Sequence, residues 1–216
     1  HLTKKADFLS KEWVPPQSRF NTDKETSRIK YGIGTNAFVF LLFAYNPFVK
    51  GLDVFLESLR HIYKINKEIT GVVVGREQMF GYLQKYFPDG LPPYVKAITP
   101  TEEVQKLYDL ADCYVLASRN EGFSYAMIEA IYCGVPVIAS DIPSLKRATT
   151  PSCVKFFESG EPESLAAVMC ETMGKSSKIK EETLKQKKYV LEKYSIDAWL
   201  NKIIGEYKIK QNKTNE

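Results

Sequence analysis

Histidine is almost absent from this chain of 216 residues: only His1 and His61 carry an imidazole. The four cysteines are equally sparse, and no two of them form a Cys-x-x-Cys pair. Structural zinc sites are usually built from such clusters, so their absence argues against zinc. Cys113 and Cys133 lie inside apolar runs, which is typical of small reduced core residues and of a cytoplasmic protein.

Long hydrophobic runs and one-sided charge are missing too. The longest apolar run, Ala37 to Tyr45, is far shorter than a bilayer span and fits a buried strand, and no segment resembles a signal peptide. The formal net charge is only +4, and no nucleic-acid-binding motif occurs, so no nucleic-acid partner is expected. With 44% hydrophobic residues, the chain can bury the core of one domain rather than two.

From residue 37 onward, short apolar runs alternate with stretches of helical periodicity. Strands are predicted at 37–44, 69–74, 94–98, 112–116, 135–139 and 154–157, and helices at 52–65, 78–87, 101–110, 124–133 and 161–173. Such alternation requires right-handed crossovers. It predicts an α/β fold: a single Rossmann-like domain with a mostly parallel six-stranded sheet between helices.

The flanking segments differ in composition. We expect a linker and short helix over 1–31, the Rossmann-like domain over 32–175, C-terminal helices over 176–210 and a disordered tail over 211–216. Residues 175–193 are rich in lysine at helical spacing; a solvated face is favoured, with contact to an anionic membrane as the alternative. Residues 194–209 predict an amphipathic helix whose apolar side must dock on something.

Ligands of open parallel sheets bind where strands turn into helices, so these turns are the candidate sites. In the first turn, Lys50 precedes Gly51 at a helix start, where the helix dipole disfavours a cation by about 0.3–1 kcal/mol. A bound anion would reverse this penalty, although a solvated lysine fits the pattern equally well. The second turn, Gly75-Arg76, gives a weaker signal, since plain turn formation also explains its glycine.

The turn after the fourth strand is the most informative. It contains Glu121, followed by Gly122, Phe123 and Ser124, whose backbone amides lie at a helix start and could hold a phosphate. The helix that follows is apolar almost all round, yet it carries Glu129 at its centre. A buried carboxylate is costly unless it is paired or hydrogen-bonded, and sugar or ribose hydroxyls can donate to it. A structural ion pair of Glu129 is the alternative.

These features together resemble a known family. Residues 108–141, YDLADCYVLASRNEGFSYAMIEAIYCGVPVIASD, resemble the C-terminal domain of the family 4 (group 1) glycosyltransferases, which are retaining enzymes of the two-domain GT-B fold. Glu121 and Glu129, with seven residues between them, match the family's E-x7-E motif. Lys50-Gly51 and the following LDVFLESL match its Lys-Gly segment and first helix.

The resemblance implies roles for individual residues. Glu121 and Lys50 are expected to be catalytic, beside the donor sugar and on the diphosphate, and Glu129 is expected to hold the ribose hydroxyls. The remaining donor-binding residues expected on these turns are Gly122, Phe123, Ser124, Tyr125, Asn46, Gly75 and Arg76. No Asp-x-Asp pair occurs, in keeping with a reaction that uses neither metal nor cofactor, in which lysine, amides and a helix dipole stabilise the leaving diphosphate.

The sequence departs from the family at several positions. The family's arginine, five or six residues before the Lys-Gly lysine, is replaced by Tyr45 and Ala44, and Arg76 or Arg119 are the candidate substitutes. Ser124 stands where the family usually has a glycine. The loop at 141–146 lacks the common paired glycines.

The resemblance implies half of a GT-B fold. We therefore expect a cytoplasmic enzyme of the hexosyltransferase type, in polysaccharide biosynthesis, that transfers sugar from a nucleoside diphosphate sugar to a glycan or lipid-linked acceptor. Its expected partners are the nucleotide sugar and the missing N-terminal acceptor-binding domain of the same protein, without which this chain is expected to be inactive. Peripheral contact with the inner face of the membrane is an alternative for its location. The rival interpretations are a non-catalytic nucleotide-binding or scaffolding domain of the same fold, and a sugar epimerase of the same architecture.

Overall fold

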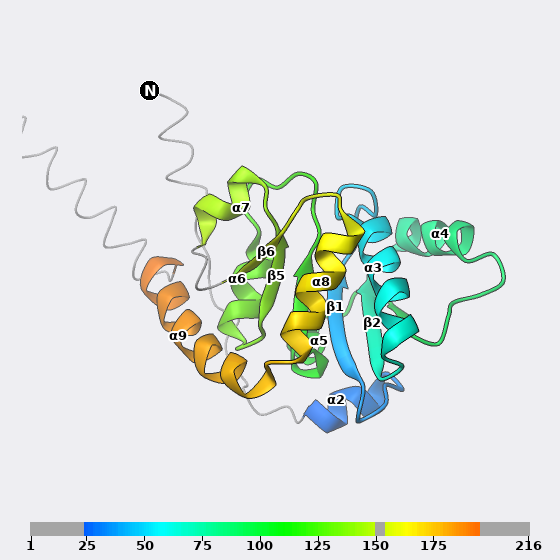
Figure 1. Cartoon of the computed structure of the whole chain (residues 1–216), viewed down its shortest axis with the longest axis horizontal. Coiled ribbons are helices and arrows are strands. Elements are labelled where there is room, and N and C mark those ends of the chain that lie inside the picture. Colours follow the sequence, from blue (N-terminus) through cyan, green and yellow to red (C-terminus); the bar gives the residue numbers. More distant parts are fainter. Residues whose placement is uncertain (1–23, 150–153, 195–216) are drawn as a thin grey trace, which may run out of the picture.

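A sheet of six parallel strands lies at the centre of the computed structural model, which describes residues 24–149 and 154–194 (Figure 1). The strand order is β3-β2-β1-β4-β5-β6, and every neighbouring pair is parallel. The strands are β1 (Phe38–Phe43), β2 (Ile69–Val74), β3 (Val95–Ile98), β4 (Cys113–Leu116), β5 (Val137–Ser140) and β6 (Lys155–Phe157). The predicted six-stranded Rossmann-like α/β fold is confirmed.

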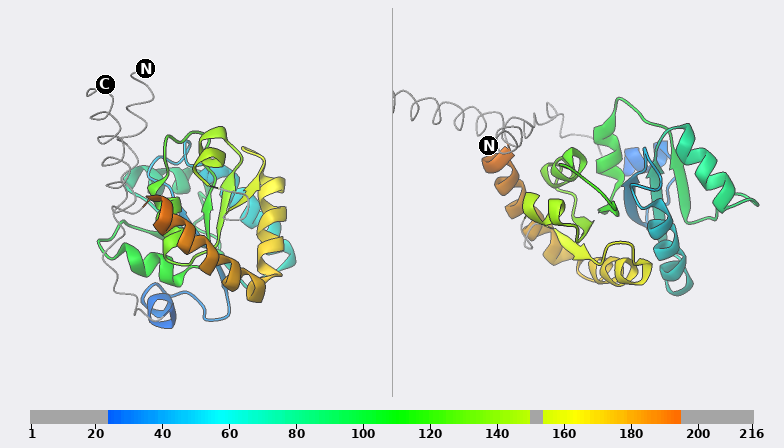
Figure 2. Two further views of the ribbon diagram at one scale, coloured as in Figure 1. Left: turned by 90° about the vertical axis from the view of Figure 1, so that its left-hand side faces the viewer. Right: turned by 90° about the horizontal axis from the view of Figure 1, so that it is seen from above.

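Helices cover both faces of the sheet, which explains why the strands read as continuous apolar runs. In β1, Phe40 and Leu42 belong to one core cluster, whereas Leu41 and Phe43 belong to the other. The first cluster is completed by α3 (Leu52–Ile65), α4 (Glu77–Tyr86) and α8 (Pro162–Met173). The second is completed by α5 (Val104–Leu110), α6 (Tyr125–Tyr132), α7 (Pro143–Ala148) and α9 (Ser176–Tyr194), and Figure 2 shows α9 on the outside of this layer.

The strand order fixes where a ligand can bind. The chain first builds β1, β2 and β3 toward one edge, then returns to the centre and builds β4, β5 and β6 toward the other. The crossovers on the two sides of β1 and β4 therefore leave in opposite directions. In open α/β sheets the crevice at this switch point, beyond the carboxyl ends of the strands, is where ligands bind.

Three predicted elements need correction or fall outside the described residues. Residues 141–146 were expected to form a loop, but residues 143–148 form α7, which begins at Pro143, a residue with no N–H to satisfy. Helix α5 begins at Val104 rather than at 101, because the Thr101 hydroxyl accepts the Glu103 amide in a turn before the helix. Of the amphipathic helix predicted over 194–209, only Tyr194 is described, as the last residue of α9; residues 1–23 and 195–216 lie outside the described part.

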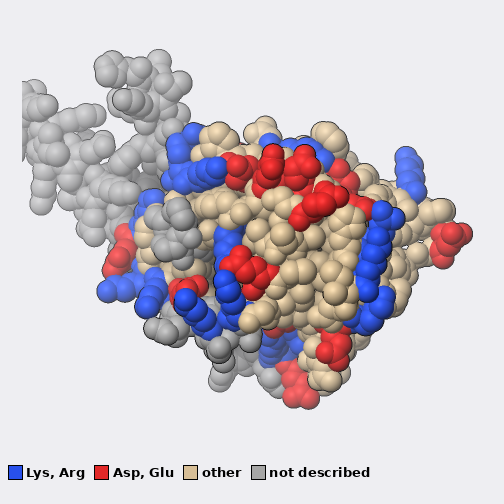
Figure 3. Space-filling model, viewed as in Figure 1, with Lys and Arg blue, Asp and Glu red and all other residues tan. Residues whose placement is uncertain are grey.

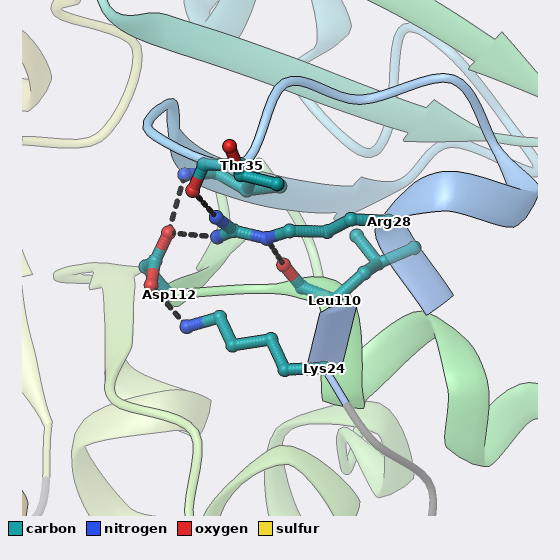
Figure 4. Close-up of polar contacts among 6 residues, drawn as sticks. Lys24, Arg28, Thr35, Leu110 and Asp112 are labelled. Carbon is teal, nitrogen blue, oxygen red and sulfur yellow. Dashed lines mark hydrogen bonds and ion pairs between the residues drawn. The ribbon is translucent and has the colours of Figure 1, made fainter. Parts of the chain in front are cut away.

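The short helix expected within residues 1–31 is present as α2 (Lys24–Lys30), and a polar network connects it to the sheet (Figure 4). The buried Arg28 donates to the carbonyls of Leu110 (3.1 Å) and Thr35 (2.9 Å) and to Asp112 (2.6 Å). Asp112 also accepts from the amide of Val39 in β1 (2.7 Å) and from the Lys24 ammonium. This network lies at the amino ends of β1 and β4. It is at the opposite end of the sheet from the carboxyl ends of the strands, where ligands of open α/β sheets bind.

Candidate functional site

Two loops meet at the carboxyl ends of β1 and β4, on either side of the switch point. The loop after β1 contains Val49 and Gly51, and the loop after β4 contains Ala117 and Arg119. The Arg119 amide donates to the Val49 carbonyl at 2.9 Å. Gly51 has a positive φ of 64°, and a Cβ built on it would lie 2.0 Å from the Ala117 carbonyl oxygen. Only glycine allows this approach, so Gly51 fixes the distance between the two loops.

Lys50 and Glu121 form an ion pair across this junction. The Lys50 ammonium contacts Oε1 of Glu121, and the Ser118 hydroxyl donates to the same oxygen at 2.8 Å. Lys50 directly precedes Gly51, the N-cap of α3, so Glu121 supplies the negative charge that a cation at a helix start requires. The sequence expectation that Lys50 and Glu121 belong to one site agrees with this pairing.

The pair keeps capacity for a ligand. The Lys50 side chain is 26% exposed, whereas that of Glu121 is 10% exposed. Within the described part of the chain, the ammonium contacts this one carboxylate, and Oε2 of Glu121 accepts no protein hydrogen bond. An ammonium can donate three hydrogen bonds, so Lys50 can hold Glu121 and still donate to a bound anion.

Arg119 is committed to the protein itself. It donates to both carboxylate oxygens of Asp53 (2.8 and 2.6 Å) and to the Phe48 carbonyl, and its guanidinium lies 4.6 Å from the centre of the Phe48 ring. Burial alone would raise the pKa of Asp53, but the hydrogen bonds and charge of Arg119 outweigh it and the pKa is lowered. A bidentate pair of this kind braces the start of α3.

Arg76 is arranged differently. It is the exposed N-cap residue of α4, directly after β2, and its guanidinium lies 5.8 Å from the centre of the Tyr45 ring. Tyr45 is one of the two positions, with Ala44, at which the resemblance leads us to expect an arginine. The Arg76 guanidinium, which follows the neighbouring strand β2, therefore places a cation beside Tyr45. In the described part of the chain, Arg76 forms no salt bridge.

Glu129 is half-buried in the middle of α6 and accepts a hydrogen bond from the Tyr108 hydroxyl at 2.9 Å. Burial raises the pKa of the neighbouring Tyr114, and the carboxylates of Glu121 and Glu129, together with Tyr45, raise it further. The two acids of the E-x7-E pair thus both act on the phenol of Tyr114. The loop acid and the helix acid therefore both lie within electrostatic range of this one phenol.

The start of α6 presents backbone donors. The Ser124 hydroxyl caps the helix by accepting the Met127 amide at 3.3 Å. Within the described residues, the amides of Gly122, Phe123 and Ser124 donate to no protein group. The Phe123 ring packs edge-on against the exposed Tyr125, with 5.1 Å between the ring centres, and at a tilt against Tyr194 of α9 at 5.3 Å. The amides rather than the side chains of this turn are therefore available to an anion.

Two of the predicted donor-binding residues have evident structural tasks. The Asn46 side chain accepts the Val49 amide at 3.2 Å and its carbonyl accepts the Lys50 amide at 2.9 Å, so Asn46 shapes the loop that presents Lys50. A Cβ on Gly75 would lie 2.8 Å from the Ala44 carbonyl and from Met79. Gly75 therefore allows β2 and α4 to approach β1, and direct contact of either residue with a donor stays a prediction.

Tyr108 and Tyr114 were not identified from the sequence as parts of the candidate site. Both side chains are buried, at most 2% exposed. Hydrogen-bonding requirements could have indicated the contact. A buried tyrosine usually needs an acceptor for its hydroxyl, and a buried carboxylate such as that of Glu129 needs a donor.

The charge on the surface is mixed. Figure 3 shows acidic and basic side chains bordering a largely uncharged area over α3 and α8, so this face has no field of one sign. Across residues 24–149 and 154–194, no three or more His, Cys, Asp and Glu side chains are grouped so that they could hold a metal ion. None of the helices in these ranges combines the length and apolarity needed to cross a bilayer.

Comparison with known proteins identifies the family. Residues 37–175 match the family described as "Glycosyl transferases group 1". The chain belongs to this family and corresponds to the C-terminal domain of its GT-B fold. Among curated proteins, it is 27% identical over 135 residues to a D-inositol 3-phosphate glycosyltransferase of Jonesia denitrificans, covering 58% of this chain and 32% of that protein. It is 25% identical over 107 residues to the O-antigen biosynthesis glycosyltransferase WclY of Escherichia coli, covering 50% and 30%.

Solved structures show the same fold. A glycosyltransferase from Rickettsia africae superposes with a TM-score of 0.76 and 19% identity, covering 86% of this chain and 51% of that one. Anabaena Alr3699/HepE, in complex with UDP and glucose, has a TM-score of 0.75 and 18% identity, covering 87% and 52%. The C-terminal domain of LpcC from Francisella tularensis has a TM-score of 0.66 and 20% identity, covering 85% and 96%. The chain spans about a third of the length of the curated relatives that it matches.

Proposed function

We propose that this chain is the nucleotide-sugar-binding C-terminal domain of a retaining glycosyltransferase of the hexosyltransferase type, which transfers a sugar from a nucleoside diphosphate sugar to a glycan or lipid-linked acceptor. One observation carries the proposal: Lys50 and Glu121 pair across the switch point of the sheet and keep hydrogen-bonding capacity for a ligand. The complexes of Anabaena HepE with UDP and with UDP-glucose support a nucleotide sugar as that ligand.

In this proposal the diphosphate lies between the Lys50 ammonium and the amides of Gly122, Phe123 and Ser124 at the start of α6. As the bond to the sugar breaks, negative charge grows on the leaving diphosphate, and fixed donors stabilise it without reorganising. Glu121 lies beside the donor sugar, where its second oxygen can accept a sugar hydroxyl. A donor bound in this way needs no metal ion and no cofactor.

We further propose Arg76 as the second cation on the diphosphate. Of the two candidates that the sequence leaves open, Arg119 holds Asp53 and the Phe48 carbonyl. Arg76 is exposed at the adjoining turn and lies beside Tyr45. Its side chain can therefore rotate onto a phosphate without breaking an ion pair of the described chain.

Glu129 is proposed to accept the ribose hydroxyls, so that the nucleoside lies over α6 and the sugar over the loop after β4. An acceptor-binding domain, not contained in this chain, is needed to complete the reaction. A cytoplasmic location with peripheral membrane contact belongs to the same proposal, because lipid-linked acceptors reside at the membrane surface.

Calorimetric titration with UDP, GDP and ADP, with their sugars and with inorganic pyrophosphate tests the proposal. We expect at least one nucleotide to bind. Lys50→Ala should weaken nucleotide and pyrophosphate alike, because the ammonium serves the phosphates. Glu129→Ala should weaken the nucleotide more than pyrophosphate, because only the nucleotide carries a ribose. Absence of binding in every titration would contradict the proposed nucleotide-sugar-binding function.

The matched control is Glu171→Ala. Glu171 is an exposed carboxylate on α8 that pairs with Lys155 and Lys175, so its removal should change neither affinity. A non-catalytic nucleotide-binding or scaffolding domain is the second candidate, favoured by Tyr45 at the position of the family's arginine. Nucleotide binding without sugar transfer, once this domain is joined to its acceptor-binding partner, would select that alternative.

A further inference from the structure

The hydroxyl of a buried tyrosine lies directly on the Glu129 carboxylate. Tyr108 of α5 is 2% exposed and donates to Oε2 of Glu129 at 2.9 Å. The Tyr108 hydroxyl also lies 3.1 Å from the carbonyl oxygen of Ala126, one helical turn before Glu129. A phenol has a single proton, and the shorter contact to a charged acceptor is the stronger of the two.

The position of this hydroxyl is fixed by aromatic packing. The Tyr108 ring meets Phe43 of β1 edge-on, with 5.6 Å between the ring centres and 75° between the planes. It meets Tyr114 of β4 at 6.1 Å and 68°. Burial, Tyr114 and the Glu129 carboxylate all raise the pKa of Tyr108 well above its ordinary value, so the phenol stays a donor.

Packing alone does not require the carboxylate. A structural tyrosine at this position would be satisfied by the Ala126 carbonyl, which is within hydrogen-bonding distance. Holding a half-buried carboxylate beside an aromatic cluster costs desolvation that such a tyrosine does not need. The Tyr108–Glu129 contact is explained if the orientation of the carboxylate itself matters.

We propose that Tyr108 is a positioning residue for ribose recognition: it holds one oxygen of Glu129 so that the carboxylate faces the two ribose hydroxyls of a nucleoside diphosphate in a fixed orientation. The inference rests on the proposed role of Glu129. A carboxylate that rotated freely would lose that freedom on every binding event, and a carboxylate already fixed does not. Tyr108 therefore serves affinity for ribose without touching the nucleotide.

The test compares ribonucleotides with deoxyribonucleotides. UDP, GDP and ADP are titrated first, and the tightest binder is carried forward with its 2′-deoxy analogue. In the wild type the deoxy analogue should bind more weakly. Tyr108→Phe should weaken the ribonucleotide about tenfold, as expected for a lost hydrogen bond to a charged group. It should weaken the 2′-deoxy analogue less, because that analogue keeps only one of the two hydroxyls that Glu129 accepts. The ratio of the two affinities should therefore fall toward one.

Tyr94→Phe is the matched control. Tyr94 is also a buried tyrosine at 8% exposure, but it packs with Tyr63 in the core cluster on the other face of the sheet. Removal of the Tyr94 hydroxyl should leave the ratio of ribonucleotide to deoxyribonucleotide affinity unchanged. A general loss of stability would weaken both nucleotides equally in either variant, so the ratio separates positioning from folding.

Glu129→Asp gives a second measurement that does not alter the aromatic cluster. Shortening the side chain keeps its charge but withdraws it from Tyr108, so discrimination should fall as it does in Tyr108→Phe. If Tyr108→Phe does not fold, Glu129→Asp decides: wild-type discrimination in that variant overturns the inference.

The outcomes separate the two levels of the argument. A wild type that binds no nucleotide overturns the proposed function and the inference together. A wild type that binds but does not distinguish ribose from deoxyribose overturns the role of Glu129 and hence that of Tyr108. A discriminating wild type with equal discrimination in Tyr108→Phe overturns the inference alone.

Discussion

Replacing Gly51 with alanine should destabilise the protein far more than the same change at another glycine of equal backbone conformation. Gly51 and Gly32 have φ angles of 64° and 61°, so alanine meets the same left-handed penalty at both, about 1–2 kcal/mol. Both changes also alter the unfolded chain in the same way, and that effect cancels in the comparison. The two sites differ in what a Cβ would contact.

At Gly32, the nearest atom to an added Cβ is the flexible Lys96 ammonium at 3.5 Å, which is ordinary contact. At Gly51, the Cβ would lie 2.0 Å from the Ala117 carbonyl oxygen and 2.9 Å from its carbon, so the backbone must separate. Overpacking of this kind costs about 1–3 kcal/mol. Separation would also stretch the hydrogen bond from the Arg119 amide to the Val49 carbonyl.

Urea unfolding followed by circular dichroism measures both variants. We expect Gly32→Ala to lose about 1–2 kcal/mol and Gly51→Ala to lose about 2–5 kcal/mol, with unchanged dependence on urea. Gly51→Ala should also weaken nucleotide binding, because the loops that carry Lys50 and Glu121 would move apart. Equal losses of stability in the two variants would show that the close approach to Ala117 is unimportant.

Three further predictions concern stability and reactivity. Gly81→Ala, inside α4 where an added Cβ meets no atom within 4 Å, should raise the unfolding free energy by about 0.8–1 kcal/mol in urea titrations. Arg119 lowers the pKa of Asp53, so their pairing stabilises the fold at pH values above the ordinary aspartate pKa, and this stabilisation is lost as the pH falls through the lowered pKa. The difference in unfolding free energy between wild type and Arg119→Ala should therefore shrink in acid. A difference that does not change with pH would contradict this prediction. Burial raises the pKa of Cys113, so a thiol reagent should label the exposed Cys170 in the native protein and Cys113 only after unfolding, as peptide mass spectrometry would show.

The fold could be predicted from hydrophobic patterns that are visible in a single sequence. β1 is apolar at every position because both of its faces are covered, and α3 shows a clear apolar stripe because one face packs on the sheet. α7 was not predicted because it is short and because Pro143 at its first position also fits a turn. Strand alternation therefore predicts the sheet, whereas short helices between strands depend on tertiary packing.

The site is predictable only in part. Lys50 and Glu121 could be assigned to one edge because the carboxyl ends of parallel strands meet there. The partners Arg119 and Asp53 lie 66 positions apart, and nothing local to either residue indicates the other. Tyr108 has the periodicity of a core residue, and its hydrogen bond to Glu129 depends on how α5 packs against α6. Sequence periodicity does not predict which side chains pair across long sequence distances.

The two ends of the sheet show why a charged cluster is not by itself a functional site. At the amino end, Asp112 accepts from Arg28, Lys24 and a backbone amide. Arg28 also donates to two carbonyls and is only 5% exposed, so this cluster is closed to a ligand. At the carboxyl end, Lys50 and Glu121 hold each other and each keeps capacity beyond that contact. Both clusters join β1 to β4, but only the second lies at the carboxyl-end switch point, beside amides at the start of α6 that donate to no group in residues 24–149 and 154–194. Residual hydrogen-bonding capacity, rather than charge alone, separates a binding site from a structural clamp, and it is the reason for proposing the ligand site at the carboxyl ends of the strands.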